Sequence, residues 1–224
     1  VEREIIERSL DLVEAVVLAS SRMPDASIRM IAKQRPVILL NRSMPDVAHV
    51  LIDDARGVQL AAEHLAGLGH RSLLYLRGPE TSYADGVRWQ ALRRVARQLG
   101  LQVHRTDPHP EPSISAGIQA AAAVADGGAT AVLAYNDALA IGLMKEFKAL
   151  GISVPGEISV VGFDNVATAQ VVDPGLTTIA APLRAMGATG VRNVLALLKG
   201  ATSSHQPYIL PVTLKVREST APPA

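Results

Sequence analysis

The segment at residues 131–165 constrains the fold of this chain most, because it shows a strand, a helix, a turn and a second strand in succession. An apolar run at 131–134 stops at the polar residues 135–137, and a second run at 158–163 stops at Asp164 and Asn165. In a parallel α/β sheet, ligands bind in the crevice beyond the carboxyl ends of the strands. Two strands that end in amide and carboxylate side chains therefore indicate a binding site for a polar ligand.

The composition is that of an ordinary globular protein. Its 224 residues suffice for one large domain or two smaller lobes. Twenty-two basic and 21 acidic residues leave a net charge of +1, which argues against a nucleic-acid surface on this chain. No stretch approaches 18 consecutive apolar residues, so no membrane span is expected. The absence of cysteine excludes disulfides and thiolate catalysis, and it is compatible with a reducing compartment.

Short apolar runs alternate with amphipathic helical patterns along the chain. Predicted strands lie at 15–19, 36–40, 50–52, 73–76, 131–135 and 159–163, and predicted helices at 58–68, 87–99, 115–125 and 138–150. Such alternation is typical of right-handed βαβ units, so the predicted fold class is α/β with mostly parallel sheets. The tail at 221–224 is short and proline-rich, and we expect it to fray.

Four segments, in order, resemble the effector-binding domain of the LacI/GalR bacterial transcription regulators. The segment NDALAIGLMKEFKALGISVPGEISVVGFDN at 136–165 is similar to the corresponding part of that family. GVQLAAEHLAGLGHRSLLYLRGP at 57–79 resembles its helix, Gly-His-Arg corner and following strand. PGLTTI at 174–179 and LPVTLKVREST at 210–220 resemble its crossover and its terminal strand. Each match is short, but the ordered set at the expected spacing is specific.

The resemblance implies two doubly wound parallel-sheet lobes of the periplasmic-binding-protein-like type I, with a ligand cleft between them. The first lobe would comprise residues 1–53 and 181–207, and the second would comprise 54–180 and 208–220, followed by the tail. Relatives carry a further strand–helix–strand and a helix-turn-helix before the segment that 1–19 resembles. We therefore expect a first lobe without its opening βαβ unit, and no DNA-binding helix-turn-helix in this chain. A bare sheet edge invites pairing with another chain.

Asp164 and Arg88 are the leading candidates for ligand contacts. The Asp164 carboxylate can accept two sugar hydroxyls, and hydrogen bonds to a charged group contribute about 1.5–3 kcal/mol each. The residues alone leave open that Asp164 caps a helix at 165–172. Arg88 can offer a planar fork to hydroxyl or carboxylate groups, although a solvated helix arginine is the commoner fate. The resemblance favours the ligand role for both, because they match the ligand-binding Asp and the ligand-clamping Arg of the family.

Four further polar residues follow two of the predicted strands. Asn136 carries an amide that both donates and accepts, so we predict it as a ligand contact, and we predict Asp137 as the N-cap of the next helix. Asn41 follows the strand at 36–40 and is the best candidate in the first lobe, although many relatives carry Asp there. Arg42 is predicted as a second contact or as a loop arginine.

The loop after Gly78 and Pro79 is where relatives set specificity, so Ser82 and Tyr83 are also predicted to contact the ligand. Tyr83 could stack on a sugar ring or could simply cover the loop. Phe163 is predicted to belong to the core rather than to a stacking platform.

No catalytic or metal-binding constellation is predicted. The six histidines show no metal-ligand spacing. No P-loop, GxGxxG or nucleophile elbow occurs, and no local spacing assembles a nucleophile, a base and an orienting group. The chain is therefore expected to have no enzymatic activity, no cofactor and no metal site.

Three functions follow, and the resemblance ranks them. The first is the effector-binding and dimerisation domain of a LacI/GalR-type regulator. There a sugar or polyol would bind between the lobes of a cytoplasmic homodimer, away from membranes, and operator DNA would be reached only through an N-terminal domain not in this chain. The alternative is an exported sugar-binding protein of a transport system. A sugar-modifying enzyme would need a catalytic base that the sequence does not show.

Overall fold

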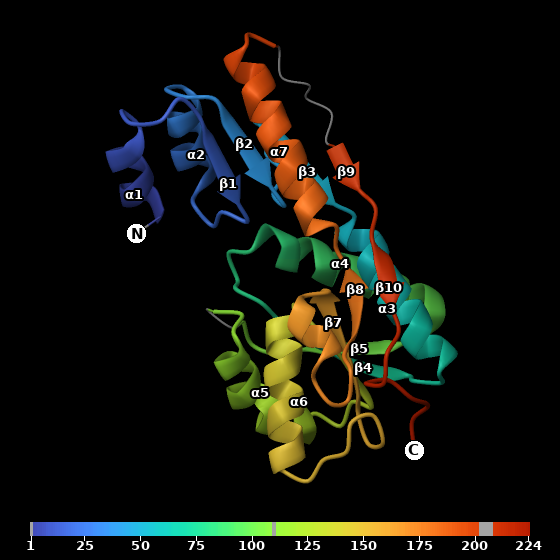
Figure 1. Ribbon diagram of the computed structural model, residues 1–224. Helices are drawn as coiled ribbons and strands as arrows, with labels where there is room; N and C mark the ends of the chain where they lie inside the picture. Colours follow the sequence, from blue (N-terminus) through green and yellow to red (C-terminus); the bar gives the residue numbers. More distant parts are fainter. Residues whose placement is uncertain (1, 109–110, 202–207) are drawn as a thin grey trace. The chain divides into compact units, whose positions relative to one another are not determined.

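The computed structural model describes residues 2–108, 111–201 and 208–224 (Figure 1). The chain divides into two compact units. Unit 1 comprises Val1–Asp53, Thr81–Ala84 and Pro182–Pro211, and unit 2 comprises Asp54–Glu80, Asp85–Ala181 and Val212–Ala224. Within the described ranges, every helix is too short or too polar to cross a bilayer.

Unit 1 is built on a four-stranded parallel sheet in the order β1-β2-β3-β9. Its helices pack on both faces of this sheet. Ile28 and Ile31 of α2 share a buried cluster with Val37 and Leu39, whereas Gly190 of α7 lies against Leu40, which points to the opposite face. The elements of unit 1 are α1 (Glu2–Ser9), β1 (Val16–Ala19), α2 (Asp25–Ala32), β2 (Val37–Leu40), β3 (Ala48–Ile52), α7 (Leu183–Leu198) and β9 (Tyr208–Leu210).

Unit 2 is built on a six-stranded sheet in the order β10-β8-β7-β6-β4-β5, and all neighbouring pairs are parallel except β10 with β8. The two sheets confirm the predicted α/β class. The strands are β4 (Ser72–Leu76), β5 (Gln102–Arg105), β6 (Ala131–Ala134), β7 (Ser159–Asp164), β8 (Thr177–Ala180) and β10 (Thr213–Lys215). The helices are α3 (Asp54–Gly67), α4 (Tyr83–Leu99, which begins in unit 1), α5 (Ile114–Asp126), α6 (Asp137–Ala149) and the 3-10 turn η1 (Ala167–Gln170).

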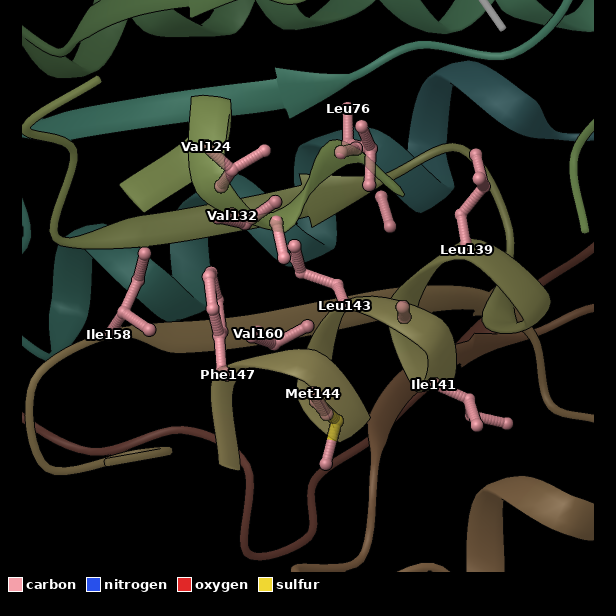
Figure 2. Close-up of a cluster of buried hydrophobic side chains, with 14 of the residues drawn as sticks. Leu76, Val124, Val132, Leu139, Ile141, Leu143, Met144, Phe147, Ile158 and Val160 are labelled. Carbon is pink, nitrogen blue, oxygen red and sulfur yellow. The ribbon is translucent and has the colours of Figure 1, made fainter. Parts of the chain in front are cut away.

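Helices α5 and α6 lie side by side over one face of the six-stranded sheet (Figure 1). Figure 2 shows Leu143 and Phe147 of α6 directed toward the strands that carry Val132 and Val160. The two helices approach so closely that a Cβ atom on Gly142 would overlap the carbonyl oxygen of Ile114. This closeness requires glycine at the contact, because no other residue leaves the two backbones room.

Helix α3 packs on the opposite face of the sheet, where Gly57 lies against the side chains of Phe163 and Ile179. The strand order reverses between β4 and β6, which makes this boundary the topological switch point of the sheet. Just beyond it, Gly78 faces the ring of Tyr135, and a Cβ atom on Gly78 would lie 2.6 Å from the ring carbons. The carboxyl ends of β6 and β7 therefore meet at the edge where an α/β sheet binds ligands.

One predicted lobe boundary and the predicted fraying of the tail are wrong. The predicted second lobe includes residues 208–210, but these residues form β9, which pairs with β3 in the sheet of unit 1. The tail does not fray at its start: the Ala221 N–H donates to Ser159 Oγ, and the Ala221 carbonyl accepts from Nε2 of the buried His70. Residues 202–207, which the predicted first lobe includes, lie outside the described residues.

Candidate functional site

Arg88 lies at the centre of a buried cluster at the strand ends of unit 2. The residue is 2% exposed, although it is an arginine on the second turn of α4. Its Nε donates to Oδ1 of Asp54 at 2.7 Å, and its Nη1 donates to the carbonyl oxygen of Tyr135. The guanidinium carbon lies 3.5 Å from the centroid of the Phe163 ring. We call Arg88, Asp54, Tyr135, Phe163 and Asp164 the Arg88 cluster.

The cluster fixes both the orientation and the charge of the guanidinium. Burial lowers the pKa of Arg88, but the carboxylates of Asp54 and Asp164 together with Tyr75 and Tyr135 outweigh it, and the net shift of the pKa is upward. Arg88 therefore stays charged. A cation over the face of an aromatic ring is attracted by the ring quadrupole, so Phe163 acts as a platform for Arg88 as well as a core residue. The alternative of a solvated helix arginine is wrong.

Asp164 ends β7 in an unusual backbone conformation. Its φ is 113°, and Asn165 follows with φ 59°. A positive φ in a residue other than glycine costs on the order of 1–3 kcal/mol and persists mainly at functional sites. Among the residues that the structure describes, none donates a hydrogen bond to the Asp164 carboxylate. The capping alternative fails, because the short turn η1 that follows has Val166 at its N-cap position and no side-chain cap.

The electrostatic surroundings of Asp164 are divided between one cation and two acids. Burial raises the pKa of Asp164 to about 7; the Arg88 guanidinium opposes this shift, and Asp137 and Asp54 reinforce it. Near neutral pH the carboxyl group can therefore exist in either protonation state. In both states it has oxygen atoms that can accept hydrogen bonds, and no described residue donates to them.

The structure gives the N-cap of α6 to Asn136 and not to Asp137. Asn136 is the N-cap: its side-chain oxygen accepts from the Leu139 N–H at 3.0 Å, and its amide donates to the Pro112 carbonyl at 3.2 Å. Asp137 is fully buried and accepts from Thr178 Oγ1. The N-cap prediction for Asp137 is therefore wrong, because its side chain turns inward to β8. Asn136 as a ligand contact stays a prediction, although its side-chain oxygen and nitrogen already form hydrogen bonds within the protein.

In unit 1, Asn41 and Arg42 follow β2. Asn41 has φ 57°, and its side-chain oxygen is buried without a hydrogen-bond partner among the described residues. Arg42 donates from Nη1 to the carbonyls of Ser21 and Met23 and from Nη2 to Asp25 Oδ1 at 2.5 Å. Arg42 thus braces the loop after β1, and its role as a second ligand contact stays a prediction. Asn41 has unused hydrogen-bonding capacity and remains the stronger predicted contact of this unit.

Ser82 and Tyr83 belong to the short segment of unit 1 at Thr81–Ala84, where α4 begins. Ser82 is partly buried and Tyr83 is 37% exposed, so the tyrosine ring has an accessible face. Both remain predicted contacts. No group of three or more His, Asp or Glu side chains that could hold a metal ion occurs in the described part of the chain.

Comparisons with known proteins identify the family. The family model of the periplasmic binding protein-like domain matches residues 62–220. The transcriptional regulator GalR of Escherichia coli is 32% identical over 230 residues, which cover 100% of this chain and 67% of GalR. The chain belongs to the LacI/GalR family. It spans 58% to 67% of the length of curated relatives that match at 32% identity.

Solved LacI-family structures have the same fold. A regulator from Enterococcus faecium with bound ribose superimposes with a TM-score of 0.85 at 30% identity, covering 98% of this chain and 84% of that one. The lac repressor dimer bound to operator and an anti-inducer superimposes with a TM-score of 0.86 at 26% identity, covering 98% and 78%. The described chain is thus a LacI-family effector-binding domain, and its relatives are regulators rather than enzymes.

The sequence does not single out Asp54, which is a member of the Arg88 cluster. Asp54 pairs with Arg88 across 34 residues of sequence, and both side chains are buried. A local signal existed, because Asp53 and Asp54 follow an apolar strand in the same way that Asp164 does. It was weak, since an acidic residue at the start of a helix is ordinarily explained by the helix dipole.

Proposed function

We propose that this domain binds a sugar or polyol effector and that Arg88 and Asp164 are its main contacts in unit 2. The observation that supports the proposal is the Asp164 carboxyl group, which lies at a strand end beside an immobilised guanidinium and accepts no hydrogen bond from a residue that the structure describes. Polyols present closely spaced hydroxyls that both donate and accept. A carboxyl acceptor next to a guanidinium donor is complementary to such a pair.

Arg88 retains capacity for a ligand after its internal bonds are made. Its Nη2 donates to none of the described residues, whereas Nε and Nη1 are used. The ribose in the Enterococcus relative supports a sugar as the effector class, and the pentoses are the first ligands to test. Asn41, Asn136, Ser82 and Tyr83 are proposed as further contacts, and Arg42 as a support of its loop.

We further propose that the regulator acts as a homodimer and reaches operator DNA through a helix-turn-helix, the element for which the curated relatives are named. A two-fold dimer suits an operator whose half-sites mirror the symmetry of the protein. The lac repressor relative is a dimer on its operator, which supports this arrangement. Effector binding would shift DNA affinity only through a difference in affinity for two protein states.

Calorimetry with ribose, other sugars and polyols tests the effector role, and the single tryptophan, Trp89, provides a fluorescence signal next to Arg88. Asp164→Ala should abolish binding, and Arg88→Lys should weaken it at least tenfold because lysine lacks the fork. Arg93→Lys, on the exposed side of the same helix, is the matched control and should bind normally. Unchanged affinity in Asp164→Ala or Arg88→Lys would refute the proposed contacts.

A further inference from the structure

We propose that Asp54 is a positioning residue of the effector site. It holds the Arg88 guanidinium in place and compensates its positive charge, so the Asp164 carboxylate remains available to accept hydrogen bonds from the ligand. The inference rests on the proposed effector role of Arg88 and Asp164. Asp54 itself would touch no ligand. It would act by keeping the Arg88 guanidinium paired with its own carboxylate and not with that of Asp164.

The geometry shows that Asp54 is the favoured partner of Arg88. The two side chains are 5% and 3% exposed, and Nε and Oδ1 are 2.7 Å apart. Asp54 is the first residue of α3, where the exposed N–H groups of the helix stabilise a negative charge. The negative charge of Asp164 lacks a comparable stabilisation, since Asp164 lies at a strand end and accepts no hydrogen bond from the described residues.

Arg88 is also prevented from turning to Asp164. Asp54 holds Nε, the Tyr135 carbonyl holds Nη1, and the Phe163 ring supports the plane of the group. A planar guanidinium fixed at three points cannot swing its fork to another carboxylate without breaking one of these contacts. Asp164 therefore lies near the cation but does not have it as a hydrogen-bonded partner.

Three charged groups act on Asp164, one from each helix around it: Arg88 from α4, Asp137 from α6 and Asp54 from α3. Asp137 is occupied by Thr178 and by the backbone N–H of Val166. Removing the charge of Asp54 would leave the Arg88 cation less compensated and free to pair with Asp164. That new pair would compete with ligand hydroxyls for the same carboxylate oxygens.

The test compares Asp54→Asn with Asp85→Asn. Asp85 is also buried and bonded to an arginine, Arg77, but it is not among the groups that act on Asp164. The carboxyl carbon of Asp164 is followed by NMR against pH in effector-free protein. We expect a midpoint near 7 in the unchanged protein and in Asp85→Asn. In Asp54→Asn the midpoint should fall by at least about one pH unit, because the cation now favours the charged form.

A second measurement uses the sugar with the highest affinity for the unchanged protein. Asp54→Asn should bind it at least fivefold more weakly at pH 8, whereas Asp85→Asn should bind it within twofold. Asp54→Glu keeps the charge, so it should retain the midpoint; it also provides a result should the Asn variant fail to fold. An unmoved midpoint in Asp54→Asn, or one lowered equally in Asp54→Glu, would overturn the proposal. A shifted midpoint in a protein that binds no sugar would support the positioning and refute the proposed function.

Discussion

Replacing Asp164 with asparagine should make the free energy of unfolding less dependent on pH. The asparagine keeps the size and the acceptor oxygen of the side chain but cannot ionise. In the folded chain the pKa of Asp164 is about 7, whereas its ordinary value is 3.8. The folded state therefore holds the proton more tightly than the unfolded state does. The stabilisation that this gives is complete below pH 4 and is lost as the pH rises through 7.

The size of the effect follows from the pKa difference. A difference of about three units at 1.36 kcal/mol per unit amounts to about 4 kcal/mol between strongly acid and alkaline solution. Of this total, the unchanged protein should lose about 2.5 kcal/mol of its free energy of unfolding between pH 5 and pH 8. The Asp164→Asn variant should not show this loss, because asparagine does not ionise. Its stability relative to the unchanged protein should therefore rise by about 2.5 kcal/mol over the same interval.

Urea unfolding at pH 5, 6, 7 and 8, followed by circular dichroism, measures the difference directly. Asp173→Asn is a suitable control, because that carboxylate is 95% exposed and should not change the slope. Two parallel curves for the unchanged protein and Asp164→Asn would refute the reasoning. They would mean that Asp164 is ionised throughout, with an ordinary pKa and a partner for its charge.

Three further outcomes are expected. Gly142→Ala should lower the free energy of unfolding by about 2 kcal/mol or more, since its Cβ would overlap the carbonyl of Ile114. The control Gly86→Ala, which has open space around it in α4, should raise the free energy of unfolding by about 0.5–1 kcal/mol. Equal effects of the two substitutions in thermal unfolding would contradict the close packing at Gly142. Asn136→Ala should cost about 1 kcal/mol through loss of the N-cap, whereas Asn136→Asp should retain stability; a neutral alanine would exclude the cap. Finally, the 224-residue chain, with net charge +1, should not retard duplex DNA in a gel at physiological salt, and a specific shift would contradict this.

Much of the fold could be predicted because its signals are local. The apolar runs that became β1, β2, β4, β6 and β7 are short and bounded by turn residues, and helical periodicity separates them. The strand β5 at Gln102–Arg105 was not predicted. It is an edge strand with three exposed residues out of four, so it needs no apolar run and leaves no hydrophobic pattern to read. The strand β9, with three residues, is also an edge strand, and only its pairing with β3 decides which sheet it joins.

The sequence by itself determined that polar side chains end two neighbouring buried strands, since the position of a residue directly after an apolar run is a local property. It also determined the likeness to a regulator family, through segments of 6 to 30 residues. Only the tertiary structure decided how those side chains are used. Whether Asn136 or Asp137 caps α6 depends on Thr178, 41 residues away from Asp137. Whether Arg88 meets solvent or Phe163 depends on how α4 packs against the sheet. Hydrogen bonds and burial between segments that are distant in the sequence determine these roles. The spacing of residues within one segment does not report the free energy of such contacts, so the roles cannot be predicted from local patterns.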